Sequence, residues 1–332
     1  MRVLTLLSPA KTLNWNPPPA SLAELWTQPR SLREADPVVK IMRDKSKSEL
    51  KKLMAVSDSI ADLNNKRFKD FIGADDIGQA KAEDIMRPAA LAYDGPAYRG
   101  LDAKTFSQEE WAFGAGCIRL LSGLYGVLRP TDLIQPYRLE MGSRVQVDGK
   151  RDLYEYWKDS ITQSLLEDVR DASSQEGFLV VNVASQEYSK AVDFGKLEEA
   201  GGKVVTCVFK DDGRVLSVFA KRARGLFARH LVVSRARSAA DLEAFSAEGY
   251  RLDRSQCADD VLVFSRSKSQ RIPPQPQATT SASNGKKKRA VPASASAAAS
   301  KKAISSAKAS SPNVVHNAAR KTKSSKGGRK KS

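Results

Sequence analysis

The sequence has few of the residues that build metal centres and disulfide frameworks. Its 332 residues include three cysteines and two histidines. Cys117, Cys207 and Cys257 lie far apart and form no CxxC pair, which excludes the usual spacing of a structural zinc site and gives no disulfide framework. We therefore expect no bound metal and a reducing compartment.

Long apolar runs are also missing. No stretch approaches the roughly 18 consecutive apolar residues of a membrane-spanning helix. The N-terminal segment MRVLTLLSPAKT is a short apolar strand followed at once by a turn, without the longer apolar region and small-residue cleavage site of a signal peptide. The sequence thus predicts a cytoplasmic protein with no membrane partner.

The common catalytic and nucleotide-binding motifs do not occur. The chain contains no GxxxxGK[ST] phosphate loop, no GxSxG, no HExxH and no dinucleotide-binding fingerprint. These absences exclude the usual P-loop, serine-hydrolase and zinc-protease sites. We predict no cofactor, and motifs alone assign no catalytic residue.

Negative charge is absent from the end of the chain. From Lys268 to Ser332 there are sixteen Lys and Arg and no Asp or Glu, which leaves 39 basic and 38 acidic residues in the first 267. The net charge of +17 therefore belongs almost entirely to a Ser-, Ala- and Lys-rich tail with too few large apolar residues to fold. We expect one domain over residues 1–266 and a disordered basic tail over 267–332.

Hydrophobic patterns in residues 1–266 predict a single domain of α+β class with mixed helices and strands. Arg2–Leu7, GFLVVNVAS and VLVFSR are typical of buried strands, RLEMGSRVQV of an alternating strand, and KVVTCVFKDDGRVLSVFA of a hairpin turning at Asp212-Gly213. Capping boxes at Ser46 and Ser107 predict helix starts. Amphipathic helices are expected in RDLYEYWKDSITQSLLEDV and KRARGLFARHLVVSRA.

A glycine turn in RLLSGLYGVLRP is the first candidate binding element. We expect a helical apolar run to stop at Gly123, with Tyr125, Gly126 and Arg129 following. Backbone amides at such a turn can approach a phosphate, while Tyr125 offers a stacking face and Arg129 a charged contact. The alternative is a helix C-cap packed into the core.

A helical pair in SELKKLMAVSDSIADLNNKRFKDF is the second. A break near Val56 separates two helical patterns, and the pair could present a basic edge to a nucleic-acid backbone. A solvated helix face is the alternative. The basic side chains concerned are Lys51, Lys52, Lys66, Arg67 and Lys69.

A polar pocket is the third. Ser8 and Lys11 follow the first strand, and ligands of open α/β sheets collect beyond the carboxyl ends of strands. Arg138 and Glu140 are two residues apart and would share one face of a strand, either as an ion pair or in a pocket with Lys11, Lys221 and Arg222. Such a pocket would suit an enzyme acting on a small anionic substrate.

Several segments, in order along residues 1–266, resemble the YaaA family of peroxide-stress-resistance proteins. They are LLSPAKTL, RLLSGLYGVLRPTDLIQPYRLEMG, DLYEYW, VVNVASQEYSK, FAKRARGLFARHLV and SAEGY. The resemblance implies a mixed α/β domain with a helix-hairpin-helix element, DNA binding that favours backbone shape over sequence, and a link to lower free iron under peroxide stress. It implies no enzymatic activity.

The position of the helix-hairpin-helix element stays open between two segments. The glycine turn has Ser122 where a proline is usual and two residues between its glycines, whereas the helical pair near Ser57 has the outline but no glycine. The expected partner is duplex or branched DNA. The expected location is the cytoplasmic nucleoid, or the nucleus if the organism is eukaryotic, because KKKR clusters serve as nuclear signals.

Overall fold

The computed structural model describes residues 1–79, 85–170 and 177–272. These residues belong to one compact unit, Met1–Pro276. Most of the basic tail predicted over 267–332 lies outside the described residues. Among the residues described, no helix is both long enough and apolar enough to cross a membrane.

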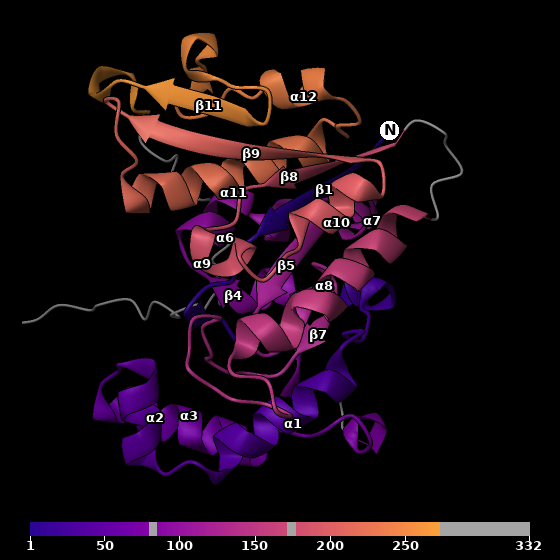
Figure 1. The fold of residues 1–332 in the computed structure, drawn as a ribbon, viewed down its shortest axis with the longest axis vertical. Coiled ribbons are helices and arrows are strands. Elements are labelled where there is room, and N and C mark those ends of the chain that lie inside the picture. The colour runs from indigo at the N-terminus through magenta and orange to yellow at the C-terminus, as the bar shows by residue number, and fades with distance from the viewer. Residues whose placement is uncertain (80–84, 171–176, 273–332) are drawn as a thin grey trace, which may run out of the picture. The chain divides into compact units, whose positions relative to one another are not determined.

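A seven-stranded sheet forms the centre of the unit (Figure 1). Its strand order is β10-β11-β9-β8-β1-β5-β6, and the inner five strands run parallel, with an antiparallel strand at each edge. In chain order the strands are β1 (Arg2–Leu7), β5 (Ile118–Ser122), β6 (Gly126–Leu128), β8 (Phe178–Asn182), β9 (Gly202–Asp211), β10 (Arg251–Leu252) and β11 (Val261–Arg266). Two small ladders pair β2 (Thr12–Leu13) with β4 (Tyr93–Asp94), and β3 (Arg87–Pro88) with β7 (Leu133–Ile134).

The buried strands follow from the sequence. Every residue of β8 and of β5 is buried, and so are the last five residues of β1. Strands covered on both faces have near-continuous apolar sequences, because neither face meets water. The mixed α/β fold is confirmed, as are the strands predicted in Arg2–Leu7, GFLVVNVAS and VLVFSR.

Helices cover the sheet and form a separate group at one end of the unit (Figure 1). Both capping boxes are present, with Ser46 and Ser107 each accepting a hydrogen bond from the backbone of a glutamate three residues later. The longer helices are α1 (Leu32–Asp44), α2 (Lys47–Met54), α3 (Asp58–Asp70), α7 (Gln108–Cys117), α8 (Leu153–Arg170) and α11 (Ser217–Val233). The short ones are α5 (Ala89–Ala92), α6 (Pro96–Leu101), α9 (Gln186–Ser189), α10 (Phe194–Glu199) and α12 (Ala239–Glu243).

Near the glycine turn, the structure differs from two of the elements predicted from the sequence. The apolar run that was expected to be helical up to Gly123 is strand β5, since α7 already ends at Cys117. β5 pairs in parallel with β1 and turns at Gly123 into antiparallel β6. A short apolar run fits a helix or a buried strand equally well, and here the pairing with β1 decides. The expected helix-hairpin-helix element is not confirmed in this segment or in α2 and α3.

The hairpin predicted at Asp212-Gly213 is wrong. Both residues have positive φ and make a tight turn, but the chain then enters α11 at Ser217. β9 instead pairs in parallel with β8 on one side and with the distant strand β11 on the other. The strand predicted in RLEMGSRVQV is also absent from the described residues, where that stretch is a loop with a single bridge between Val147 and Lys150.

Candidate functional site

A cavity of about 500 Å³ lies at the carboxyl ends of β1 and β8. The chain leaves β1 for its neighbour β5 on one side and leaves β8 for β9 on the other, so the connections diverge at this point. Divergence of this kind creates a crevice where open α/β sheets bind ligands. The cavity is lined by residues 7–12, 94–98 and 185–188, together with Lys221 and Arg224 of α11.

Hydrogen bonds of Ser8 connect the segments that follow β1 and β8, which border this cavity. Its hydroxyl accepts a hydrogen bond from the backbone N–H of Ser185 (2.8 Å) and lies 3.2 Å from the Ser185 hydroxyl. Its carbonyl accepts one from the Tyr98 hydroxyl (3.0 Å). The position beyond the first strand, proposed from the sequence, is therefore both structural and part of the cavity wall.

A carboxylate with two cations stands beside the cavity. Lys11 Nζ is 3.3 Å from Glu140 Oε1, and Arg138 donates to the same oxygen at 2.9 Å. Three of the predicted pocket residues thus come together, although Arg138 and Glu140 lie on a loop. Arg222, the fourth cation expected there, instead pairs with Glu248 at 2.6 Å and does not line the cavity.

Lys221 and Arg224 are the two cations that α11 contributes to the cavity wall. Neither forms an ion pair with any residue that the structure describes. Arg224 is half-buried, and this burial lowers the pKa of its guanidinium. A half-buried cation is costly unless an opposite charge approaches it, so an anion in the cavity would stabilise the charged form of Arg224.

A second basic cavity, of about 490 Å³, lies next to the first. Its wall includes Lys45, Lys52, Arg144 and one carboxylate, Glu49, which accepts hydrogen bonds from Ser46 and interacts with the charge of Lys45. Lys52 and Arg144 form no ion pair with described residues. Gly142 lines this cavity, and its N–H donates to Glu187 of the first (3.4 Å), so the two share a wall.

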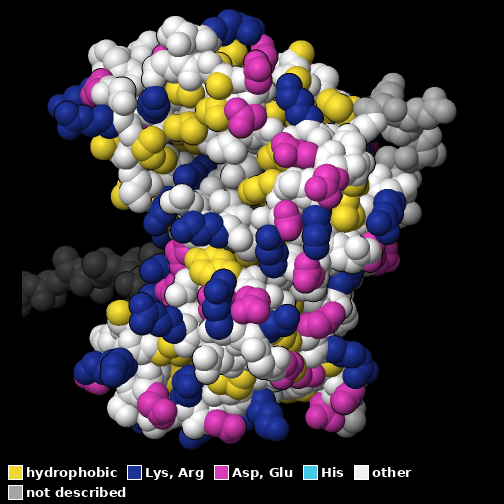
Figure 2. Space-filling view, viewed as in Figure 1, with side chains coloured by type: hydrophobic (Ala, Val, Ile, Leu, Met, Phe, Trp, Pro, Cys, Tyr) yellow, Lys and Arg dark blue, Asp and Glu magenta, His cyan; other side chains and the backbone are white. Residues whose placement is uncertain are grey.

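We call the two cavities together the basic cleft, defined by its cations. Figure 2 shows Lys and Arg side chains around the indentation between α9 and α11. Positive charge is thereby concentrated on a part of the chain whose net charge is nearly zero. The cations are Lys11, Lys45, Lys52, Arg144, Lys221 and Arg224.

Comparison with known proteins shows which family the chain belongs to. Residues 3–256 match the family described as Peroxide stress protein YaaA. UPF0246 protein IL2146 of Idiomarina loihiensis is 40% identical over 273 residues, covering 81% of this chain and all of the relative. The chain belongs to the YaaA family. UPF0246 protein Sbal195_1149 of Shewanella baltica is 38% identical over 273 residues, covering 80% of this chain and all of that protein.

In the helical pair α2 and α3 of this YaaA-family protein, two of the five predicted DNA-binding cations form ion pairs with carboxylates of the same pair. Lys51 pairs with Asp58 (2.9 Å) and Lys66 pairs with Asp70, both at the surface. Arg67 is half-buried, which lowers the pKa of its guanidinium, and it reaches the Asn64 side chain at 3.5 Å. Lys69 is exposed. Of the five cations predicted here, Lys52 is the one that lines the basic cleft.

The glycine turn of the YaaA-family protein is part of the core. Gly123 and Gly126 are buried, and Tyr125 is 1% exposed. A Cβ on Gly126, at φ +65°, would lie 2.6 Å from the Trp157 ring. The N–H groups of residues 124 and 125 donate to the Ser122 hydroxyl at 3.2 and 3.0 Å. The amides that could have held a phosphate are thus already bonded. The turn packs into the core, as the alternative reading expected, but it joins two strands and caps no helix.

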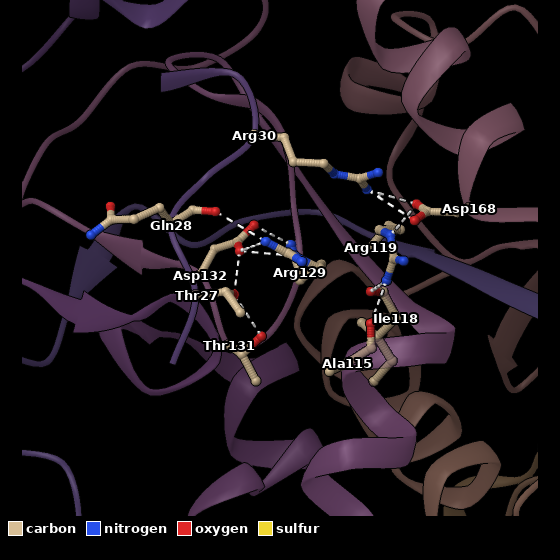
Figure 3. A network of polar contacts seen from close by, with 10 residues as sticks. All are labelled: Thr27, Gln28, Arg30, Ala115, Ile118, Arg119, Arg129, Thr131, Asp132 and Asp168. Carbon is tan, nitrogen blue, oxygen red and sulfur yellow. Dashed lines mark hydrogen bonds and ion pairs between the residues drawn. The ribbon is translucent and has the colours of Figure 1, made fainter. Parts of the chain in front are cut away.

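Arg129 is likewise held by the protein. Figure 3 shows it facing Asp132. Arg129 Nη2 lies 2.9 Å from Asp132 Oδ1, and Nη2 also donates to the carbonyl of Gln28 (3.0 Å). In the same view Arg119 and Arg30 converge on Asp168. These are structural ion pairs that join the N-terminal segment to the sheet and α8.

Two of the three cysteines of the YaaA-family protein are buried, and Cys257 is partly exposed. Cys117 is buried, and burial raises the pKa of its thiol to about 12. Burial also raises the pKa of Cys207. Across the described stretches of the chain, no three His, Cys, Asp or Glu side chains are grouped as metal ligands.

Proposed function

We propose that this member of a peroxide-stress family is a DNA-binding protein that holds sugar-phosphate backbone in the basic cleft. The supporting observation is the set of four cations there, Lys52, Arg144, Lys221 and Arg224, that have no carboxylate partner among the described residues. Lys and Arg that meet phosphates release condensed counterions, which drives binding to DNA of any sequence. On the nucleoid, a protein bound in this way would limit iron-dependent damage to the strand it covers.

We assign recognition of DNA shape to the folded part of the chain, called the body below, and non-specific DNA affinity to the basic tail. The first 267 residues carry a net charge of about +1, so any DNA contact depends on where charges lie and not on their excess. The sixteen basic residues from Lys268 onward can neutralise phosphates of any nucleic acid. Discrimination between duplex and branched DNA therefore belongs to the basic cleft.

A salt series on the body alone and on the full chain tests this proposal. The body is best taken as residues 1–276, because a cut at 267 would remove Arg271, whose guanidinium donates to buried Asp211 (2.8 Å). Four phosphate contacts give a slope of roughly −3.6 in a plot of log affinity against log salt. We expect about that slope for the body by fluorescence anisotropy, and a steeper one for the full chain.

DNA binding by the tail alone would contradict the proposal. A body that does not bind duplex or four-way-junction DNA at 25–50 mM salt, while the full chain does, would place all binding in the tail. The alternative function then gains, because Lys11, Arg138 and Glu140 do form one cluster beside the cavity. It is an enzyme acting on a small anionic substrate, and a thermal-shift screen of phosphorylated metabolites on the body would test it.

A further inference from the structure

The cavity at the ends of β1 and β8 has two chemically different parts. Its walls carry apolar side chains, Leu7, Pro9, Ala10, Pro96 and Ala97, and two aromatic rings, Tyr98 and Tyr188. Burial raises the pKa of both phenols, so they stay neutral. Its cations are Lys11, Lys221 and Arg224. A ligand that fits must therefore combine a flat or apolar portion with a negative charge.

The acidic groups of the cavity leave this charge pattern intact. Asp94 is paired with Arg99 (3.0 Å), and Glu187 accepts the N–H of Gly142 (3.4 Å). Glu140 lies between Lys11 and Arg138. Lys221 and Arg224 are left to meet the charge of a ligand, while Glu187 can accept a hydrogen bond from an amino group.

Size restricts the ligand further. A volume of about 500 Å³ lies within the roughly 300–1,000 Å³ of small-molecule sites. A double helix cannot enter such a space, whereas one nucleotide can. Bases that leave a duplex are held by stacking between aromatic and apolar side chains, and their phosphates remain outside in the charged rim.

The second cavity lies where the DNA strand next to a nucleotide seated in the first cavity would pass. Four residues of chain connect Glu140, beside the first cavity, to Arg144 in the second, a span of at most about 14 Å. One strand of a duplex rises about 3.4 Å per nucleotide, so the span from Glu140 to Arg144 corresponds to roughly four nucleotides at most. Lys52 and Arg144 can thus contact phosphates next to a nucleotide seated in the first cavity.

From these features we propose that the cavity at the ends of β1 and β8 receives a single nucleotide extruded from bound duplex DNA. The inference rests on the proposed DNA binding and names the part of the DNA that is recognised. Extrusion costs a few kcal/mol for a paired base and least for a mismatched one. The protein therefore prefers duplexes that contain a weak base pair.

The test uses the full chain and two duplexes of one sequence, one matched and one with a central mismatch that contains 2-aminopurine. We expect the mismatched duplex to bind at least ten-fold more tightly in anisotropy titrations at 150 mM salt. The 2-aminopurine fluorescence should rise several-fold on binding, because the base leaves its stack. Acrylamide should quench the 2-aminopurine fluorescence less in the complex than in the free duplex, because the cavity walls shield the base.

A filled cavity provides the matched comparison. Ala10→Trp places an indole in the cavity and should bring the ratio of the two affinities close to one. Ala200→Trp, at the exposed residue that follows α10, should leave this ratio unchanged. Equal affinity for both duplexes with no fluorescence rise in the wild-type chain overturns the nucleotide site alone. Absence of binding to either duplex overturns the proposed DNA binding as well.

Discussion

Reversing the charge of Lys221 and Arg224 together is expected to weaken duplex binding by residues 1–276 at least 100-fold. Neither cation forms an ion pair with the described residues, so the substitutions Lys221→Glu and Arg224→Glu disturb no internal salt bridge there. A hydrogen bond to a charged group contributes about 1.5–3 kcal/mol, and two such contacts are lost. Anisotropy at 50 mM salt would measure the loss, and the salt dependence should become shallower by roughly two contacts.

A second pair of substitutions with the same change in net charge is the control. Lys203 lies at the start of β9, at the opposite end of that strand from the cleft, and Arg237 follows the last turn of α11. Both are exposed. Lys203→Glu with Arg237→Glu should reduce affinity several-fold at most. Equal losses for the two pairs would mean that net charge, and not the basic cleft, controls binding.

Asp211→Ala is expected to lower the free energy of unfolding by about 3–5 kcal/mol. Asp211, at the end of β9, is 1% exposed and accepts hydrogen bonds from Arg266 (2.9 Å), Arg271 (2.8 Å) and Tyr250. Removing the carboxylate takes from the buried Arg266 guanidinium its nearest negative charge and leaves it the Glu248 carbonyl (2.6 Å) and the more distant Glu248 carboxylate (3.9 Å). Removing one partner is the costly way to break a buried pair. Denaturant unfolding followed by circular dichroism measures the difference.

The same carboxylate makes stability depend on pH. Burial alone would raise the pKa of Asp211, but the hydrogen bonds from Tyr250, Arg266 and Arg271 hold it below its ordinary value of 3.8. The contribution of Asp211 to the free energy of unfolding is therefore fully present above the pKa that this carboxyl has in the unfolded chain. It is lost as the pH falls below about 4 and through the pKa of the carboxyl in the folded protein. Asp211→Ala should flatten this acid limb.

Asp159→Ala is the matched control for the stability measurements. Its carboxylate, on α8, is 81% exposed and pairs with Lys196 at 2.9 Å. Exposed pairs contribute roughly 0–1 kcal/mol, so this variant should unfold almost like the wild type. A loss at Asp211 no larger than at Asp159 would contradict a structural role for the Asp211 cluster.

Local signals in the sequence were sufficient for much of the fold. The strands β1, β8 and β11 are continuous apolar runs, and α2 and α7 begin at capping boxes whose partners lie three residues apart. These features depend on residues that are close together in the chain. They could be predicted because the physical cause is contained in the segment itself.

Pairing between distant segments could not be predicted in the same way. β5 is a strand because it lies beside β1, more than a hundred residues earlier, and the same apolar run would suit a buried helix. Val215 and Leu216 looked like the second arm of a hairpin, yet β9 already had β11 on one side and β8 on the other. The turn at Asp212-Gly213 is real, but it leads into a helix.

The site was predicted in part for the same reason. Ser8 and Lys11 follow a strand end, a position that marks ligand sites in open α/β sheets, and the cavity is there. On α11 we predict Lys221 and Arg222 from the sequence, whereas Lys221 and Arg224 line the cavity. Residues three apart on a helix lie on one face and adjacent residues do not, so spacing could have identified Arg224. Arg144 lies on a loop and gives no such signal.

Lysine footprinting of the full chain tests the basic cleft most directly. Amine-reactive labelling followed by mass spectrometry, with and without duplex DNA, measures how far each lysine is shielded. We expect DNA to protect Lys11, Lys52 and Lys221 while Lys203 is labelled equally in both samples. Protection restricted to lysines beyond residue 272, with Lys11, Lys52 and Lys221 unchanged, would contradict the account.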